Sequence, residues 1–125
     1  MCEKINLEYG FSSSLKILFS RISTSTGLAE WFADDVQRRG NIFLFYWGKT
    51  VQKAELIKIK QMEYVRFRWL SSLNPDEYFE FAMNEEPITK DVALLITDFA
   101  EKDEVSETVE VWNKQIDKLH SILGA

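Results

Sequence analysis

The feature of the sequence that most limits the fold is a single apolar stripe along its C-terminal segment. Its apolar side chains recur at intervals of 4, 3, 4, 3 and 4 residues: Val105, Val109, Trp112, Ile116, Leu119 and Leu123. This spacing is typical of an amphipathic helix that buries one face. A dimeric coiled coil is the alternative, but it needs roughly three or four heptads, more than this stripe spans. We therefore expect a helix of about five turns, capped by Asp103 and ended by Gly124, that packs on another layer of the same chain.

The other layer is predicted by a run of strand patterns between residues 36 and 99. Turn sequences rich in Gly, Asn, Asp and Pro divide this region into about six segments. Rings alternate with polar residues inside them, as Phe67 does with Arg66 and Arg68. Such alternation is typical of an antiparallel sheet with one buried and one exposed face. Residues 5–11 show the same alternation and predict a first strand.

Two short helices are expected between the first strand and the rest of the sheet. Ser12-Ser13-Ser14 can cap a helix whose apolar residues recur at helical spacing. The break Thr24-Ser25-Thr26-Gly27 can start a second helix of about two turns, with Leu28, Trp31 and Phe32 on one side. The predicted class is α+β: a curved antiparallel sheet of about six or seven strands wrapped around a long C-terminal helix, with two short helices between strands 1 and 2.

Composition and charge exclude several kinds of partner and site. The 15 Lys+Arg against 20 Asp+Glu give a net charge of −5, which disfavours nucleic acid and anionic membrane surfaces. Apolar runs are too short for a membrane span, and the start of the chain lacks a signal peptide's apolar core, so we expect a cytoplasmic monomer. The lone Cys2, the single His120 and isolated glycines provide no zinc motif, catalytic triad or phosphate loop. We predict no metal and no cofactor, and interpret His120 as a surface residue.

Two arginines on one face of a predicted strand have a structural and a functional interpretation. Arg66 and Arg68 lie two residues apart, so both point to the polar side of the sheet. Cross-strand pairing with Glu80 or Glu55 is favoured, because acidic residues surround them in a negatively charged chain. An anion-binding patch is the alternative.

The order of elements, together with several loose motifs, resembles the helix-grip superfamily. The motifs are Leu28-Ala29-Glu30-Trp31-Phe32, Phe67-Arg68-Trp69-Leu70, Leu94-Leu95-Ile96-Thr97-Asp98-Phe99, and Val111-Trp112 with Ile116-Asp117-Lys118-Leu119. The superfamily includes StAR-related lipid-transfer, birch-pollen-allergen-like and polyketide-cyclase proteins. The chain looks most similar to the branch named after the activator of heat-shock protein 90 ATPase, in its small bacterial START-like members. The resemblance covers residues 5–123 and implies a single START-like domain over residues 1–125.

The resemblance implies a cavity between the sheet and the long helix that holds a lipid or other apolar small molecule without catalysis. Trp31 and Phe32 would close one end of it, while Asp34 and Asp35 face water on the following turn. The candidate cavity residues are Trp31, Phe32, Phe43, Phe67, Trp69, Phe79, Phe81, Met83, Leu94, Ile96, Asp98, Trp112 and Ile116. Aromatic side chains at this spacing more often fill a core than line a binding site. The resemblance to a fold that commonly leaves a cavity makes both outcomes equally expected here.

Asp98 is the carboxylate most directly tied to the predicted cavity. Alternation with Ile96 and Leu94 places it on the apolar side of its strand, where a carboxylate needs a partner. The resemblance implies that it could hydrogen-bond a ligand's head group; alternatively, it lies at the strand end and reaches solvent.

Two other functions stay open at this point. One is a protein-interaction module related to the chaperone activators, whose partner would be another protein. The weaker one is an enzyme of polyketide cyclase or aromatase type, in which Asp98, Tyr46 or Tyr64 would move protons. We predict no catalytic residue.

Overall fold

The strands and helices follow the predicted order in the computed structural model, which describes residues 2–124. The strands are β1 (Cys2–Phe11), β2 (Asp35–Arg39), β3 (Ile42–Trp47), β4 (Thr50–Lys60), β5 (Tyr64–Trp69), β6 (Phe79–Glu85) and β7 (Val92–Glu101). The helices are α1 (Leu15–Ser23), α2 (Ser25–Leu28) and α3 (Val105–Leu123), with a short 3-10 helix, η1 (Lys102–Glu104), before α3. All strand pairs are antiparallel, in the order β1-β7-β6-β5-β4-β3-β2.

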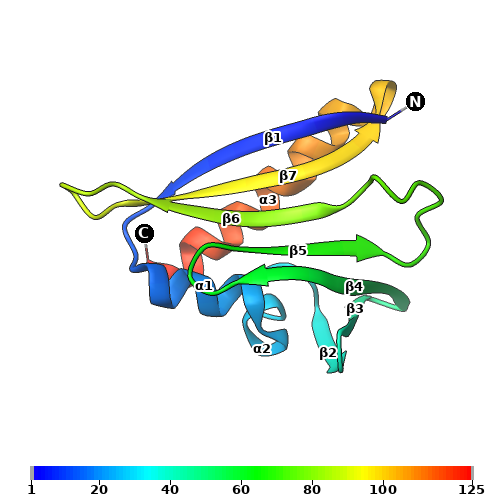
Figure 1. Ribbon diagram of the computed structural model, residues 1–125, viewed down its shortest axis with the longest axis horizontal. Coiled ribbons are helices and arrows are strands. Elements are labelled where there is room, and N and C mark those ends of the chain that lie inside the picture. Colours follow the sequence, from blue (N-terminus) through cyan, green and yellow to red (C-terminus); the bar gives the residue numbers. More distant parts are fainter. Residues whose placement is uncertain (1, 125) are drawn as a thin grey trace.

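The helices share one side of this sheet. Helix α3 crosses behind the strands in Figure 1 and contacts β1 and β7, while α1 contacts β5 and β6. The register between β4 and β5 shifts between Leu56 and Lys58, and such an irregularity increases the local twist of a sheet. Buried side chains from the helices and from the inner face of the sheet form one hydrophobic cluster. The predicted α+β helix-grip architecture is confirmed.

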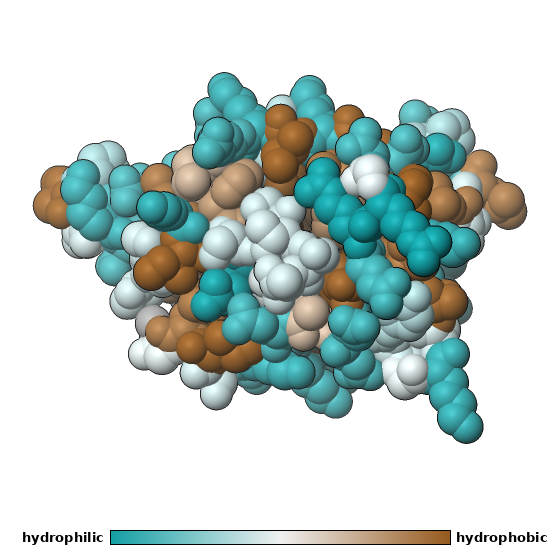
Figure 2. Space-filling model, turned by 90° about the horizontal axis from the view of Figure 1, so that it is seen from below, coloured by the Kyte–Doolittle hydropathy of each residue, from teal (hydrophilic) through white to brown (hydrophobic). Residues whose placement is uncertain are grey.

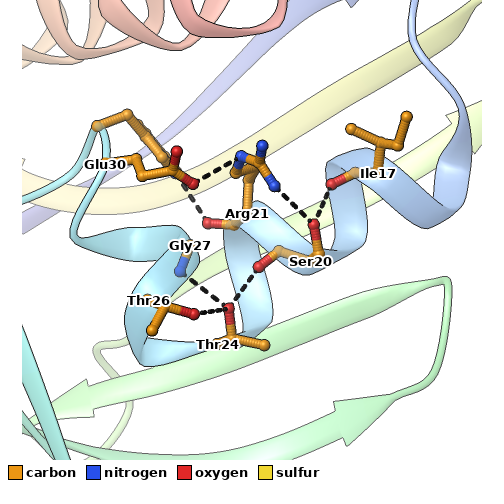
Figure 3. A network of polar contacts seen from close by, with 8 residues as sticks. Ile17, Ser20, Arg21, Thr24, Thr26, Gly27 and Glu30 are labelled. Carbon is orange, nitrogen blue, oxygen red and sulfur yellow. Dashed lines mark hydrogen bonds and ion pairs between the residues drawn. The ribbon is translucent and has the colours of Figure 1, made fainter.

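Polar contacts fix the junction between α1 and α2, which Figure 3 shows. The side chain of Ser14 caps α1 as predicted, and Thr24 Oγ1 caps α2 by accepting a hydrogen bond from Gly27 N at 2.9 Å. An ion pair of 2.9 Å joins Arg21 Nε to Glu30 Oε2. Helix α2 is shorter than predicted and ends at Leu28. The chain then continues in a turn in which the backbone N–H groups of Phe32 and Ala33 donate to the carbonyl oxygen of Leu28.

The long helix follows the predicted stripe, although its start was predicted wrongly. Trp112, Ile116 and Leu119 are buried against the sheet. Gly124 ends the helix in the left-handed region at φ 72°, where glycine carries no steric penalty. Asp103 does not cap α3, because it lies inside η1, and the N-cap position falls on Glu104 without a side-chain hydrogen bond.

His120 is a half-exposed residue on α3, as predicted, but its ring makes two contacts that the sequence did not indicate. Its ring stacks on Phe11 with 4.0 Å between the ring centroids. Its Nε2 lies 2.7 Å from the carbonyl oxygen of Gly10. The side chain therefore pins the end of α3 to the end of β1. The apolar pattern of the helix did not predict this contact, because His120 lies beside the stripe rather than in it.

The outer face of the sheet carries the predicted cross-strand charges. Arg66 Nε lies 2.6 Å from Glu80 Oε2, and the Arg66 guanidinium sits 4.0 Å from the centroid of the Tyr78 ring. Arg68 lies opposite Glu55 in the strand register. The favoured interpretation of Arg66 as a structural residue is therefore confirmed.

Exposed apolar side chains are dispersed over the surface. Figure 2 shows hydrophobic residues in separate groups among hydrophilic ones on the face that it presents. The most exposed are Leu73 at 99% and Ile88 at 88%, both outside the strands. Among residues 2–124, no helix is long and apolar enough to cross a membrane.

Candidate functional site

A cavity of about 410 Å³, open to solvent, lies between α3 and the inner face of the sheet. Every strand from β3 to β7, the turn after α2 and one side of α3 contribute to its wall. The lining residues are Phe32, Trp47, Gln52, Trp69, Phe79, Asp98, Thr108, Val111, Trp112 and Gln115. We call this space the main cavity.

Aromatic rings that contact one another make up half of its lining residues. Phe32 stacks on Trp112 at 5.6 Å between centroids and meets Trp47 edge-on at 5.5 Å. Trp69 stacks on Phe79 at 4.7 Å. Aromatic pairs in these geometries are worth about 0.5–1.5 kcal/mol each beyond the area they bury, so the wall holds its shape.

Hydrogen bonds fix the positions of these rings. The carbonyl oxygen of Phe32 accepts from Trp47 Nε1 at 3.0 Å and from Gln115 Nε2 at 2.8 Å. The first bond ties the turn after α2 to β3, and the second ties it to α3. The cavity is therefore pre-formed by three elements that are far apart in the sequence.

Asp98 provides the ionisable group of the main cavity. Its Oδ2 accepts a hydrogen bond from Trp112 Nε1 at 2.9 Å, and its Oδ1 accepts from the backbone N–H of Phe99 at 2.8 Å. Burial raises the pKa of Asp98 above its ordinary value, although these two hydrogen bonds act in the opposite direction, and the nearby Glu77 carboxylate raises it further. Asp98 therefore lies on the inner side of its strand but stays half-exposed, and its contact with a ligand remains a prediction.

We expect the stability of the protein to report this raised pKa. The folded state binds the Asp98 proton more tightly, so this stabilisation is complete below about pH 4 and is lost as the pH rises through the raised pKa. The free energy of unfolding of the natural protein, minus that of Asp98→Asn, should therefore fall between about pH 3 and pH 7. Urea titrations over this range measure the difference, in which the titrations common to both proteins cancel. A difference that stays constant or rises would contradict the assignment.

A smaller side cavity of about 290 Å³ adjoins the main one. The two spaces share Trp69, Asp98 and Thr108. The remaining wall of the side cavity is more polar and includes Ser71, Ser72, Glu77, Tyr78 and Phe99. Asp98 thus stands at the junction of an aromatic space and a polar one.

Comparison with known proteins identifies the family of this chain. The family model for the START-like superfamily domain matches residues 1–125. The chain belongs to the START-like superfamily. Domains of this superfamily typically bind hydrophobic ligands. No curated protein matches the chain.

Solved structures similar to this START-like chain come from several bacteria. BfR322 from Bacteroides fragilis, solved by NMR, is 40% identical, with 97% of this chain and 90% of that chain covered and a TM-score of 0.69. The Aha1 dimer from Colwellia psychrerythraea is 16% identical, with 97% of this chain and 96% of that chain covered and a TM-score of 0.77. DynU16, a protein of the dynemicin biosynthetic locus, is 13% identical, with 98% of this chain and 47% of that chain covered and a TM-score of 0.81. The last two likenesses show the fold alone.

The START-like fold divides the predicted cavity residues into two groups. Phe32, Trp69, Phe79, Asp98 and Trp112 line the main cavity. The others are buried in the hydrophobic core and are not among its lining residues: Trp31, Phe43, Phe67, Phe81, Met83, Leu94, Ile96 and Ile116. The rings therefore both fill a core and line a hole.

Trp31 and Phe32, the adjacent rings predicted to close one end of the cavity, have different positions. Trp31 is buried and donates from Nε1 to the carbonyl oxygen of Arg21 at 2.8 Å, which anchors it to α1. Phe32 lies in the cavity wall. Asp34 is exposed as predicted, but its Oδ2 also accepts from the backbone N–H of Gly48 at 2.7 Å and so holds the β3–β4 turn.

Sequence reasoning missed half of the lining set. The missed residues are Trp47, Gln52, Thr108, Val111 and Gln115. A signal existed for Trp47, because it shares parity with Phe43 and Phe45 along β3 and so faces the same side. Gln52 shares parity with the buried Ala54 and Leu56 on β4, but its polar side chain gave no indication of a cavity. Thr108, Val111 and Gln115 lie on α3 beside the predicted apolar stripe. Among residues 2–124, no group of three or more metal-ligating side chains could hold a metal ion.

Proposed function

We propose that this START-like domain binds an apolar small molecule with a flat or ring-shaped body in the main cavity, without transforming it. The observation that carries the proposal is a space of about 410 Å³ whose wall is built from five aromatic side chains. Ligand cavities of small-molecule binding proteins measure roughly 300–1,000 Å³ and are mostly apolar with few polar groups. The main cavity has both properties.

The energetics of this wall favour binding by area burial. Removing apolar surface from water contributes about 25 cal/mol per Å², so a ligand that buries about 250 Å² gains about 6 kcal/mol before the costs of association. Those costs are lower when the site is pre-formed. The hydrogen bonds from Trp47 and Gln115 to the Phe32 carbonyl support such a pre-formed wall.

The lining residues support binding rather than catalysis. Asp98 is the one ionisable side chain among the residues that line the main cavity, and Trp112 and Phe99 already engage its two oxygens. Proton transfer in a cyclase-type reaction commonly uses more than one positioned acid or base. The chaperone-activator alternative rests on fold likeness alone, because the Aha1 dimer shares 16% identity with this chain.

A variant that fills the mouth of the main cavity tests the proposal. Val111 lines the cavity and is 55% exposed, so Val111→Trp adds bulk at the opening at little cost to the core. We expect the natural protein to bind the neutral fluorescent probe N-phenyl-1-naphthylamine saturably, and Val111→Trp to bind it at least about tenfold more weakly, which corresponds to about 1.4 kcal/mol. Fluorescence titration measures both constants.

Val51→Trp is the matched control. Val51 is 45% exposed on β4 and is absent from the cavity wall. Its variant should bind the probe as the natural protein does. Equal affinity for both tryptophan variants, or no saturable binding by the natural protein, would refute the proposal.

A further inference from the structure

The fixed charges around the two cavities are all of one sign. Asp98 and Glu77 are the carboxylates among the lining residues of the main and side cavities. Within the described part of the chain, neither lining set contains a lysine, arginine or histidine. A ligand that enters therefore meets carboxylates and aromatic rings.

This charge pattern disfavours an anionic head group. A carboxylate, sulfonate or phosphate placed at the junction would lose water and would meet Asp98 at close range without a compensating cation. The positive end of helix α3 offers little compensation, because Asp103, Glu104 and Glu107 surround its first turn. Like charge at this point acts as a barrier to fatty acids and acidic lipids.

The same pattern matches a cation. Aromatic faces attract ammonium groups, with tryptophan the strongest, and desolvated examples are worth about 2 kcal/mol or more. Trp47, Trp69 and Trp112 all line the main cavity. Each carboxylate oxygen of Asp98 accepts one hydrogen bond, from Phe99 N or from Trp112 Nε1, and has a second lone pair to offer. The two groups that recognise organic ammonium ions are thus adjacent.

The electrostatics of the junction agree with this reading. Burial and the Glu77 charge both raise the pKa of Asp98, which means that the ionised carboxylate lacks a sufficient positive partner. A bound cation would supply that partner.

We infer that the ligand is an organic cation: a flat or ring-shaped apolar body that lies against the tryptophans, joined to a protonated amine or quaternary ammonium group that sits at Asp98 and faces the side cavity. This inference rests on the proposed function and specifies its ligand class. Asp98 provides specificity, whereas the rings provide affinity for any apolar body of suitable shape.

Three probes of similar shape and different charge test the inference. They are benzyltrimethylammonium, its neutral carbon isostere neopentylbenzene, and the anion phenylmethanesulfonate. Competition against N-phenyl-1-naphthylamine gives their relative affinities. We expect the cation to bind at least about tenfold more tightly than the neutral isostere, and the anion to bind most weakly.

Two matched variants then assign the preference to Asp98. Asp98→Asn keeps the shape and an oxygen acceptor for Trp112 but removes the charge. It should weaken benzyltrimethylammonium about tenfold and leave neopentylbenzene within about twofold. Glu8→Gln removes one charge from an exposed position on β1 and should change neither affinity.

The outcomes separate this inference from the proposed function. Binding of N-phenyl-1-naphthylamine without a preference for the cation, or a preference that survives in Asp98→Asn, overturns the inference and leaves the proposed function standing. Failure of N-phenyl-1-naphthylamine to bind at all overturns both.

Discussion

Replacing Phe32 with alanine is expected to lower the free energy of unfolding by about 4 kcal/mol, in the upper range for buried rings. Phe32 is 4% exposed and lies at the centre of the aromatic cluster. Its ring contacts Phe45 at 5.1 Å and Trp112 at 5.6 Å, so it joins the strands to α3. Truncation would leave a void that these rings cannot refill, because their own positions depend on it. Chemical denaturation followed by tryptophan fluorescence measures the loss.

Phe99→Ala is the control for this prediction. Phe99 is half-buried on β7 and meets Tyr78 edge-on at 5.2 Å. Phe99→Ala removes the same atoms as Phe32→Ala but leaves little void. We therefore expect its free energy of unfolding to fall by less than about 2 kcal/mol. Equal losses in the two variants would show that Phe32 does not hold the layers together.

Gly27→Ala should destabilise the protein by about 3 kcal/mol or more, although alanine is normally the better helix residue. A Cβ at position 27 would collide with the backbone carbonyl oxygen of Ser20 and would lie 2.7 Å from Arg21 Cα. Both contacts are with the backbone of α1, so no side-chain rotation relieves them. Helices α1 and α2 would have to separate, and the turn that places Phe32 would move with them. Thermal and urea unfolding measure the effect.

Gly10→Ala serves as the comparison. A Cβ at position 10 meets nothing within 4 Å, and Gly10 lies in a strand. A change within about 1 kcal/mol is expected, because alanine also lowers the entropy of the unfolded chain. If Gly27→Ala proves as mild as Gly10→Ala, the close approach of the two short helices is not as described.

The helices and strands with a periodic sequence could be predicted, because the period depends only on neighbouring residues. The stripe from Val105 to Leu123 predicts a helix with one buried face, and the alternation around Phe67 predicts a strand with one buried face. Ser14 and Gly124 mark helix ends through side-chain capping and left-handed geometry, and both predictions are confirmed. The N-terminus of α3 was predicted wrongly, because several acidic residues there are equivalent by composition and the 3-10 turn decides between them.

The candidate site was less predictable than the fold. Parity separates the inner face from the outer face but gives no position along that face, so Phe67 and Phe79 look alike in the sequence. Only Phe79 lines the main cavity. The polar lining residues Gln52 and Gln115 are exposed or half-exposed, and their positions indicate a site only when the strands and α3 are brought together.

The sequence alone determined the kind of layers in this protein, because the periods of helix and strand are properties of neighbouring residues. It also indicated which rings lie on the inner face of the sheet, whereas it left Asp98 open between that face and solvent. Only the tertiary structure decided where those rings stop touching one another. A cavity is the space that remains after residues far apart in the chain have packed, so its position depends on distances between elements, such as the one that brings Trp112 to Asp98.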